Sequence, residues 1–155
     1  MNTTHLSRWL IASSVLAAPP ALSAEPPVVG IVAIGTNPSP KIERWATFYD
    51  HIRDLGWRNG DTVRFAPRFA DGSKAKADAM LNELVVAKAA VIVVTGATEA
   101  LAAQRATSSV PVVMLHVDDP ARLGLVRSLS RPGGSITGLS SRAPGVARKQ
   151  VELIT

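Results

Sequence analysis

Runs of consecutive apolar residues constrain the fold of this 155-residue chain more than any other feature. The clearest runs cover 28–34, 90–94 and 111–117. Apolar runs of this length without polar alternation are typical of strands that are buried on both faces, as in a parallel sheet. Segments with helical spacing separate the runs, so the chain is predicted to form βαβ units with right-handed crossovers.

The segments between the runs supply the helices. Ser39 and Pro40 are predicted to cap and open a first helix, which Gly56 ends in the left-handed conformation. Further helices are expected after Asp71-Gly72-Ser73, over 99–107, over 121–129, and from Pro144 to the end of the sequence.

The order of the strands follows from how strongly each one is buried. The segment 62–66 alternates between polar and apolar residues and is followed by Pro67, which is typical of a strand near a sheet edge. A fifth strand is expected over 135–139. An edge-like second strand beside a fully apolar first strand favours the order 2-1-3-4-5. The predicted fold class is therefore α/β, a doubly wound parallel sheet of five strands with a flavodoxin-like order.

The first 24 residues are expected to be a secretory signal peptide that is cleaved near Ala24, which would leave 25–155 as one lobe in the periplasm. Arg8 supplies the positive charge, and an apolar core follows over 9–18. That core is about half as long as a membrane span, and prolines interrupt it, so an anchor is disfavoured. The absence of cysteine excludes lipid attachment and thiolate metal sites.

Charge and motifs argue against several other functions. The formal net charge of +5 comes from scattered basic residues without a recognition motif, so no nucleic-acid partner is predicted. The sequence has no dinucleotide fingerprint, Walker A loop or serine elbow, and its histidines form no triad with a serine. We therefore predict no enzyme activity, no cofactor and no metal.

Ligands of open parallel sheets bind beyond the carboxyl ends of the strands, and three segments are predicted to reach that edge. Gly35 and Thr36 follow the first strand, where small residues let a ligand lie against the backbone. Thr95, Gly96 and Thr98 follow the third strand at a helix N-terminus, which favours an anion such as a ligand carboxylate. Plain structural interpretations remain open, with Gly35 serving its turn and Thr98 capping its own helix.

The third segment at that edge is Asp118-Asp119, directly after the fourth strand. Either carboxylate could bind a ligand ammonium group, or Asp119 could only cap the helix that follows. Arg131 to Gly134 is interpreted as a helix stop, because Pro132 ends a helix and the two glycines permit positive φ.

The stretch 118–140, DDPARLGLVRSLSRPGGSITGLS, resembles the N-terminal lobe of ABC-transporter substrate-binding proteins. That family carries a DP…GLV.SL.RPGGN.TG pattern, from which Ser135 departs. The segment 96–107 and the turn Leu55-Gly56-Trp57 support the resemblance, which extends over 28–155. It implies a two-lobe protein that captures a small organic solute, such as an amino acid, and delivers it to a membrane permease that an ATPase drives.

The resemblance also implies that a second lobe is missing, so we expect a truncated product or a fragment. Half a cleft buries little of a small solute, and weak or absent binding by this chain alone is expected. The alternative is a stand-alone α/β ligand-sensing or interaction module without transport activity, in which a second subunit supplies the other wall of the cleft.

Overall fold

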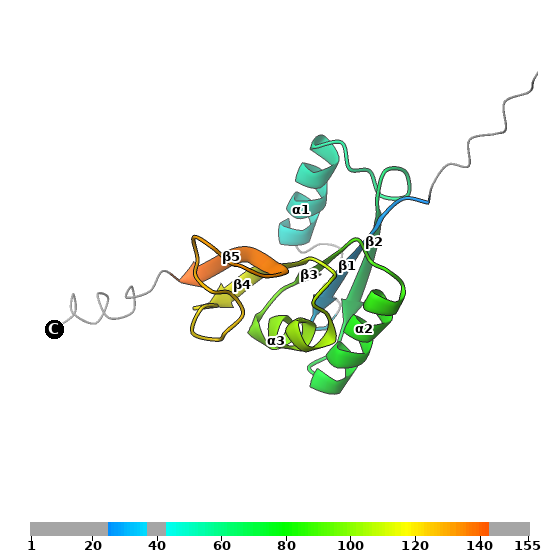
Figure 1. The fold of residues 1–155 in the computed structure, drawn as a ribbon. Coiled ribbons are helices and arrows are strands. Elements are labelled where there is room, and N and C mark those ends of the chain that lie inside the picture. The colour runs from blue at the N-terminus through cyan, green and yellow to red at the C-terminus, as the bar shows by residue number, and fades with distance from the viewer. Residues whose placement is uncertain (1–24, 37–42, 143–155) are drawn as a thin grey trace, which may run out of the picture.

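A computed structural model describes residues 25–36 and 43–142 of the chain (Figure 1). Five parallel strands form one sheet in the order β2-β1-β3-β4-β5, which confirms the predicted fold class and strand order. The strands are β1 (Val28–Ala33), β2 (Arg64–Phe69), β3 (Val91–Val94), β4 (Val112–Asp118) and β5 (Ile136–Arg142). β2 contains Pro67 and lies at the sheet edge, as predicted.

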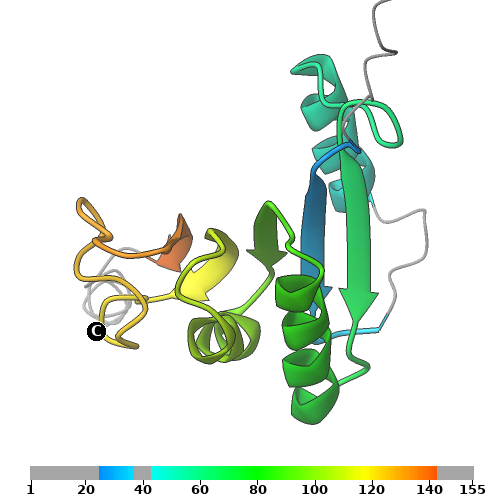
Figure 2. The ribbon, with the colours of Figure 1, turned by 45° about the vertical axis from the view of Figure 1, so that its right-hand side comes forward.

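In the described part of the chain, three helices lie on the two faces of the sheet (Figures 1 and 2). They are α1 (Glu43–Asp54), α2 (Lys74–Val86) and α3 (Ala97–Ala106). Side chains alternate between the faces along a strand. In β2, Ala66 belongs to the core beneath α2 and α3, whereas its neighbour Phe65 stacks on α1. The sheet is therefore covered by α2 and α3 on one face and by α1 on the other.

The core beneath α2 and α3 is built from one set of alternating strand residues. Val32, Ile92 and Val94 are fully buried there, and Leu81 and Leu84 of α2 pack with them. Small residues bring the layers close together. A Cβ on Gly30 would lie 2.5 Å from a methyl group of Leu84, so α2 packs directly on the backbone of β1.

An aromatic cluster joins α1 to the other face of the sheet. The rings of Phe48 and Tyr49 lie edge to face with that of Phe65 in β2, at centroid distances of 6.3 and 5.1 Å. Trp45 extends the cluster along α1, 5.8 Å from Phe48. Burial raises the pKa of the Tyr49 hydroxyl above its usual value. Gly56 follows α1 with φ of +93°, as predicted for a left-handed residue at a helix end.

The predicted helix over 121–129 is wrong. The backbone over 120–127 forms turns and bends instead. Hydrogen bonds from Leu123 to Asp119 and from Leu125 to Pro120 close single turns, and Gly124 then adopts φ of +71°. A left-handed residue interrupts helical bonding, so no helix propagates. Leu125 and Val126 are nevertheless buried, which accounts for the apolar pattern that had indicated a helix.

Glycines govern the return from these turns into β5. Gly133 has φ of +73°, which agrees with the predicted positive φ, but no helix precedes the Arg131–Gly134 segment, so its predicted role as a helix stop is wrong. Gly138 within β5 has φ of +139°, and a Cβ there would lie 2.0 Å from the carbonyl oxygen of Met114. β4 and β5 therefore approach each other more closely at this point than any side chain allows. The predicted cap at Ser39 and Pro40, the last helix from Pro144, and the signal peptide lie outside the described residues.

Candidate functional site

The carboxyl ends of β1 and β3 lie side by side and form the centre of the predicted ligand-binding edge. Val32 of β1 is in register with Val94 of β3, so Ile34 and Thr95 leave the sheet at nearly the same level. The backbone beyond β1 is also tied to the turn after β2. Gly72 N donates to Ile34 O at 2.6 Å, and Asp71 N donates to Gly35 O at 3.2 Å.

A buried glutamate, Glu99, links the two strand ends. Its side chain is only 1% exposed. Oε1 accepts a hydrogen bond from Ile34 N at 2.7 Å and another from the hydroxyl of Thr95 at 2.9 Å. The second oxygen, Oε2, is buried and has no hydrogen-bond partner in the described part of the chain. A single side chain thus fixes the position of both loops at this edge.

Gly96 is the N-cap of α3, and its size matters to Glu99. It offers no side-chain cap to the helix. Its φ of −157° is extended and open to any residue, so the requirement for glycine is steric rather than conformational. A Cβ at this position would lie 3.1 Å from Oε2 of Glu99. Oε2 of Glu99 therefore lies close to the position that a side chain at residue 96 would occupy.

The sequence interpretation missed Glu99. An acidic residue three positions after an N-cap is a known signal, because its carboxylate interacts with the free N–H groups and the positive end of the helix dipole. That signal was present in the sequence. The signal does not reveal burial, because acidic side chains are rarely fully buried and most lie at the surface.

The structure brings four predicted residues to this edge. Thr95 and Gly96 contact Glu99 directly, and Gly35 and Thr36 follow Ile34 as exposed residues. A Cβ on Gly35 would meet nothing within 4 Å, so the turn leaves open space at that point. The backbone after β1 and the N-terminus of α3 thus border one exposed surface.

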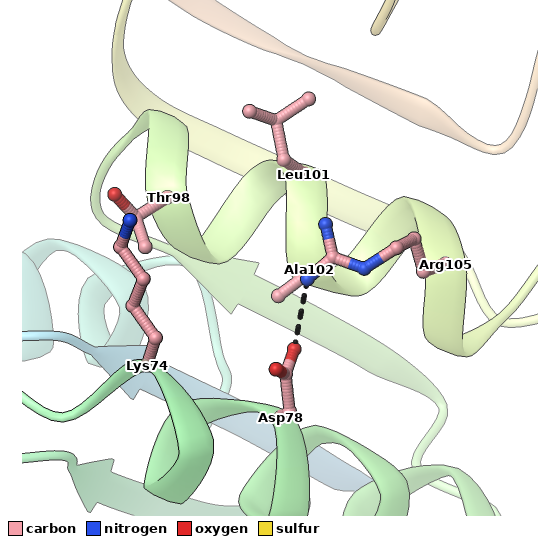
Figure 3. Close-up of a pocket in the computed structure, with 6 residues that line it drawn as sticks. All are labelled: Lys74, Asp78, Thr98, Leu101, Ala102 and Arg105. Carbon is pink, nitrogen blue, oxygen red and sulfur yellow. Dashed lines mark hydrogen bonds and ion pairs between the residues drawn. The ribbon is translucent and has the colours of Figure 1, made fainter.

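Thr98 lies elsewhere, in the groove between α2 and α3. It lines a cavity of about 160 Å³ together with residues of both helices (Figure 3). These are Lys74, Asp78, Leu101, Ala102 and Arg105. Arg105 pairs with Asp78 across the groove at 3.0 Å. Since Gly96 is the N-cap, Thr98 lies inside the first turn of α3 and does not cap it.

Asp118 and Asp119 lie farther along the edge, on the side of β5. β4 continues four residues beyond Met114, the partner of the last residue of β3, with irregular pairing to β5. Asp118 accepts a hydrogen bond from the hydroxyl of Ser141. Asp119 has φ of +44°, and its Oδ1 accepts from Arg122 N at 3.1 Å. Asp119 therefore caps a turn rather than the predicted helix.

The described residues contain neither a cluster of metal ligands nor a membrane-spanning helix. His116 is exposed on β4. Within 25–36 and 43–142, no three histidine or acidic side chains gather as metal ligands. No helix in that part of the chain combines the length and apolarity needed to cross a membrane.

The fold and the edge define the class of protein: an open α/β lobe whose loops border an exposed surface at the carboxyl ends of parallel strands, where such folds bind ligands. The family model described as ABC transporter substrate binding protein matches residues 29–155. The chain belongs to this family, which confirms the resemblance read from the sequence.

One relative is the tyrosine-binding protein of Clostridioides difficile strain R20291. It is 31% identical over 93 residues, a match that covers 60% of this chain and 27% of that protein. The chain therefore spans well under two thirds of the length of the relative that it matches.

Solved structures show the same lobe within longer proteins. An ABC domain from Streptococcus pneumonia in complex with L-Trp has 28% identity and a TM-score of 0.67, covering 84% of this chain and 43% of that one. A conserved domain protein from Vibrio cholerae has 29% identity and a TM-score of 0.71, covering 84% and 43%. The ligand-free, open structure of a Clostridium difficile substrate binding protein with adhesive properties matches in fold, with a TM-score of 0.71 at 23% identity.

Proposed function

We propose that this chain is the solute-binding component of an ABC import system and that its solute is an amino acid, with aromatic amino acids as the first candidates. The observation that carries the proposal is the match to the substrate-binding family over nearly the whole sequence after the predicted leader. Two similar proteins support the solute class, since one is named for tyrosine and the other was solved with L-Trp.

The geometry of the lobe supports a place for binding in this proposal. Loops after β1 and β3 border the exposed carboxyl edge, and Glu99 holds them together. We assign solute contact to Gly35, Thr36, Thr95 and Gly96 at this edge. Thr98, Asp118 and Asp119 remain weaker candidates, because the first faces the α2–α3 groove and the acids lie toward β5.

Export and delivery complete the proposal. The chain is directed to the periplasm by residues 1–24, where it captures the solute and presents it to a permease in the inner membrane. Binding itself is not catalysis, and the matching family model describes a binding protein rather than an enzyme.

A binding experiment tests the solute class. Saturation-transfer NMR with a panel of L-amino acids is expected to give signals for tryptophan and tyrosine and weaker ones for alanine and glutamate. One lobe buries only part of a small ligand, so weak binding is expected. Absence of a signal from every amino acid would contradict the proposed solute. Micromolar affinity in calorimetry would instead show that one lobe is sufficient.

An uptake experiment tests the transport role. Cells that lack the gene should import the labelled amino acid more slowly, and expression of the complete protein should restore the rate. Unchanged uptake of every amino acid that the protein binds would favour the alternative of a sensing or interaction module.

A further inference from the structure

The N-terminus of α3 already contains an anion supplied by the chain itself. Free N–H groups and the helix dipole at such a terminus favour negative charge. Here Glu99 in the first turn supplies a carboxylate that is 1% exposed. The sequence had indicated a place for a ligand carboxylate at this terminus, but the internal carboxylate now competes with any second anion there.

Only one of the two carboxylate oxygens of Glu99 accepts hydrogen bonds within the described residues. Both partners of Oε1, Ile34 N and the Thr95 hydroxyl, act as donors. Oε2 has no donor within the described residues, although it is buried. Buried polar atoms without partners are uncommon, and each calls for an explanation such as a ligand role. Oε2 can still accept a hydrogen bond, and it lies against Gly96, next to the loop at the sheet edge.

The described strand ends at the β1–β3 edge contribute no basic side chain that would offset this charge. The stretches 33–36 and 94–99 contain no lysine or arginine. Several basic groups of the described chain are engaged elsewhere. Lys76 pairs with Asp71 at 3.4 Å, Arg122 pairs with Asp119 at 3.5 Å, and Lys74 lines the α2–α3 groove.

We propose that the edge between β1 and β3 selects an ammonium group over a carboxylate, and that Glu99 is the residue that sets this preference. The ammonium end of the solute then faces this lobe, and its carboxylate end points away from α3. A poorly solvated carboxylate attracts a nearby cation more strongly than an exposed carboxylate does. At this edge only Gly96 would separate the carboxylate of Glu99 from the ammonium group. This inference rests on the proposed function for the location of the site, but not for the identity of the solute.

Two ring-matched probes test the preference. Tyramine carries an ammonium group and no carboxylate, and 3-(4-hydroxyphenyl)propionate carries a carboxylate and no ammonium group. Each is titrated at constant ionic strength into the ¹⁵N-labelled chain, and the backbone amide signals of Ile34, Gly96 and Ala97 are followed. We expect tyramine to shift these signals saturably, with a dissociation constant about tenfold lower than that of the acid, which corresponds to about 1.4 kcal/mol.

Variants connect the preference to Glu99. E99Q keeps the shape of the side chain and removes its charge, so the two dissociation constants should become similar. E83Q is the matched control, because it changes the net charge equally at an exposed position of α2 and should leave the tenfold ratio intact. E99A provides a second neutral variant, and dispersed amide spectra show that each variant is folded.

The possible outcomes are distinct. A preference for the acid, equal binding of the two probes, absence of a tyramine response, or a ratio that E99Q and E99A leave unchanged would each overturn the inference. Failure of tyrosine and tryptophan to bind would count against the proposed solute class instead. That failure would leave the comparison of the two probes intact.

Discussion

The two halves of the sheet's carboxyl edge are organised in different ways. At the β1–β3 half, a buried side chain holds two loops together, with Glu99 bonded to Ile34 across 65 positions of sequence. At the β4–β5 half, local turns and glycines set the backbone, and the side chain of Asp119 bonds to Arg122, three residues away. The first half is held by one buried side chain, whereas the second combines local turns with the close approach of two strands and an exposed contact between Asp118 and Ser141.

This difference matches the roles that we assign to the two halves. A site that must hold charge in a fixed place needs buried, cross-linked groups, because exposed charges are screened by water and salt. The acids of the β4–β5 half are exposed or partly exposed and already engage neighbours. The comparison therefore favours the β1–β3 half as the ligand-selecting region.

The largest effect is expected from Gly138→Ala, which tests the backbone-based half. A methyl group would lie 2.0 Å from the Met114 carbonyl oxygen, and φ of +139° is unfavourable for alanine. The free energy of unfolding in urea should fall by about 3 kcal/mol or more. Gly134→Ala is the control, because its Cβ would meet nothing within 4 Å, and a change within about 1 kcal/mol is expected. Equal effects at both glycines would contradict the close approach of β4 and β5.

Glu99→Ala should have the next largest effect and tests the half built on a side chain. The variant leaves Ile34 N–H and the Thr95 hydroxyl without their acceptor, while it removes the unpartnered Oε2. A net loss of about 2 kcal/mol in the free energy of unfolding is expected. Glu99→Gln retains the acceptor and should cost less than about 1 kcal/mol.

Hydrogen exchange adds a local measurement to the same comparison. The Ile34 amide should exchange faster in Glu99→Ala than in Glu99→Gln, since only alanine removes its acceptor. If both variants protect Ile34 as the native chain does, the link between the two loops does not depend on Glu99.

The smallest effect is expected from Asp119→Ala. Alanine removes the acceptor of Arg122 N and tolerates φ of +44° less well than aspartate, so about 1 kcal/mol should be lost in urea unfolding. Asp119→Asn keeps both features and should stay within about 0.5 kcal/mol of the native chain. A loss larger than that of Glu99→Ala would reverse our ranking of the two halves.

Sequence patterns predicted the parts of this fold that depend on periodicity. The unbroken apolar runs gave β1, β3 and β4, and the alternating segment before Pro67 gave the edge position of β2. The turn over 120–127 escaped prediction because Leu125 and Val126 are buried as helix residues would be, while Gly124 adopts a left-handed conformation that spacing does not reveal.

The candidate site was predictable in place but not in chemistry. The loops that follow neighbouring parallel strands lie at the same edge of the sheet. The sequence alone could therefore group Gly35, Thr36, Thr95 and Gly96. The central role of Glu99 depends on contacts with Ile34, which lies far away in the sequence, and on burial that an acidic residue rarely has. Only the folded arrangement reveals both.

The most direct test of this account is a titration of the ¹⁵N-labelled chain with L-tryptophan, followed through the backbone amide signals. We predict saturable shifts that are largest at 34–36 and 95–97, on the β1–β3 half of the edge. Absence of any saturable shift, or shifts confined to Lys74, Arg105 and their neighbours in the α2–α3 groove, would contradict the account.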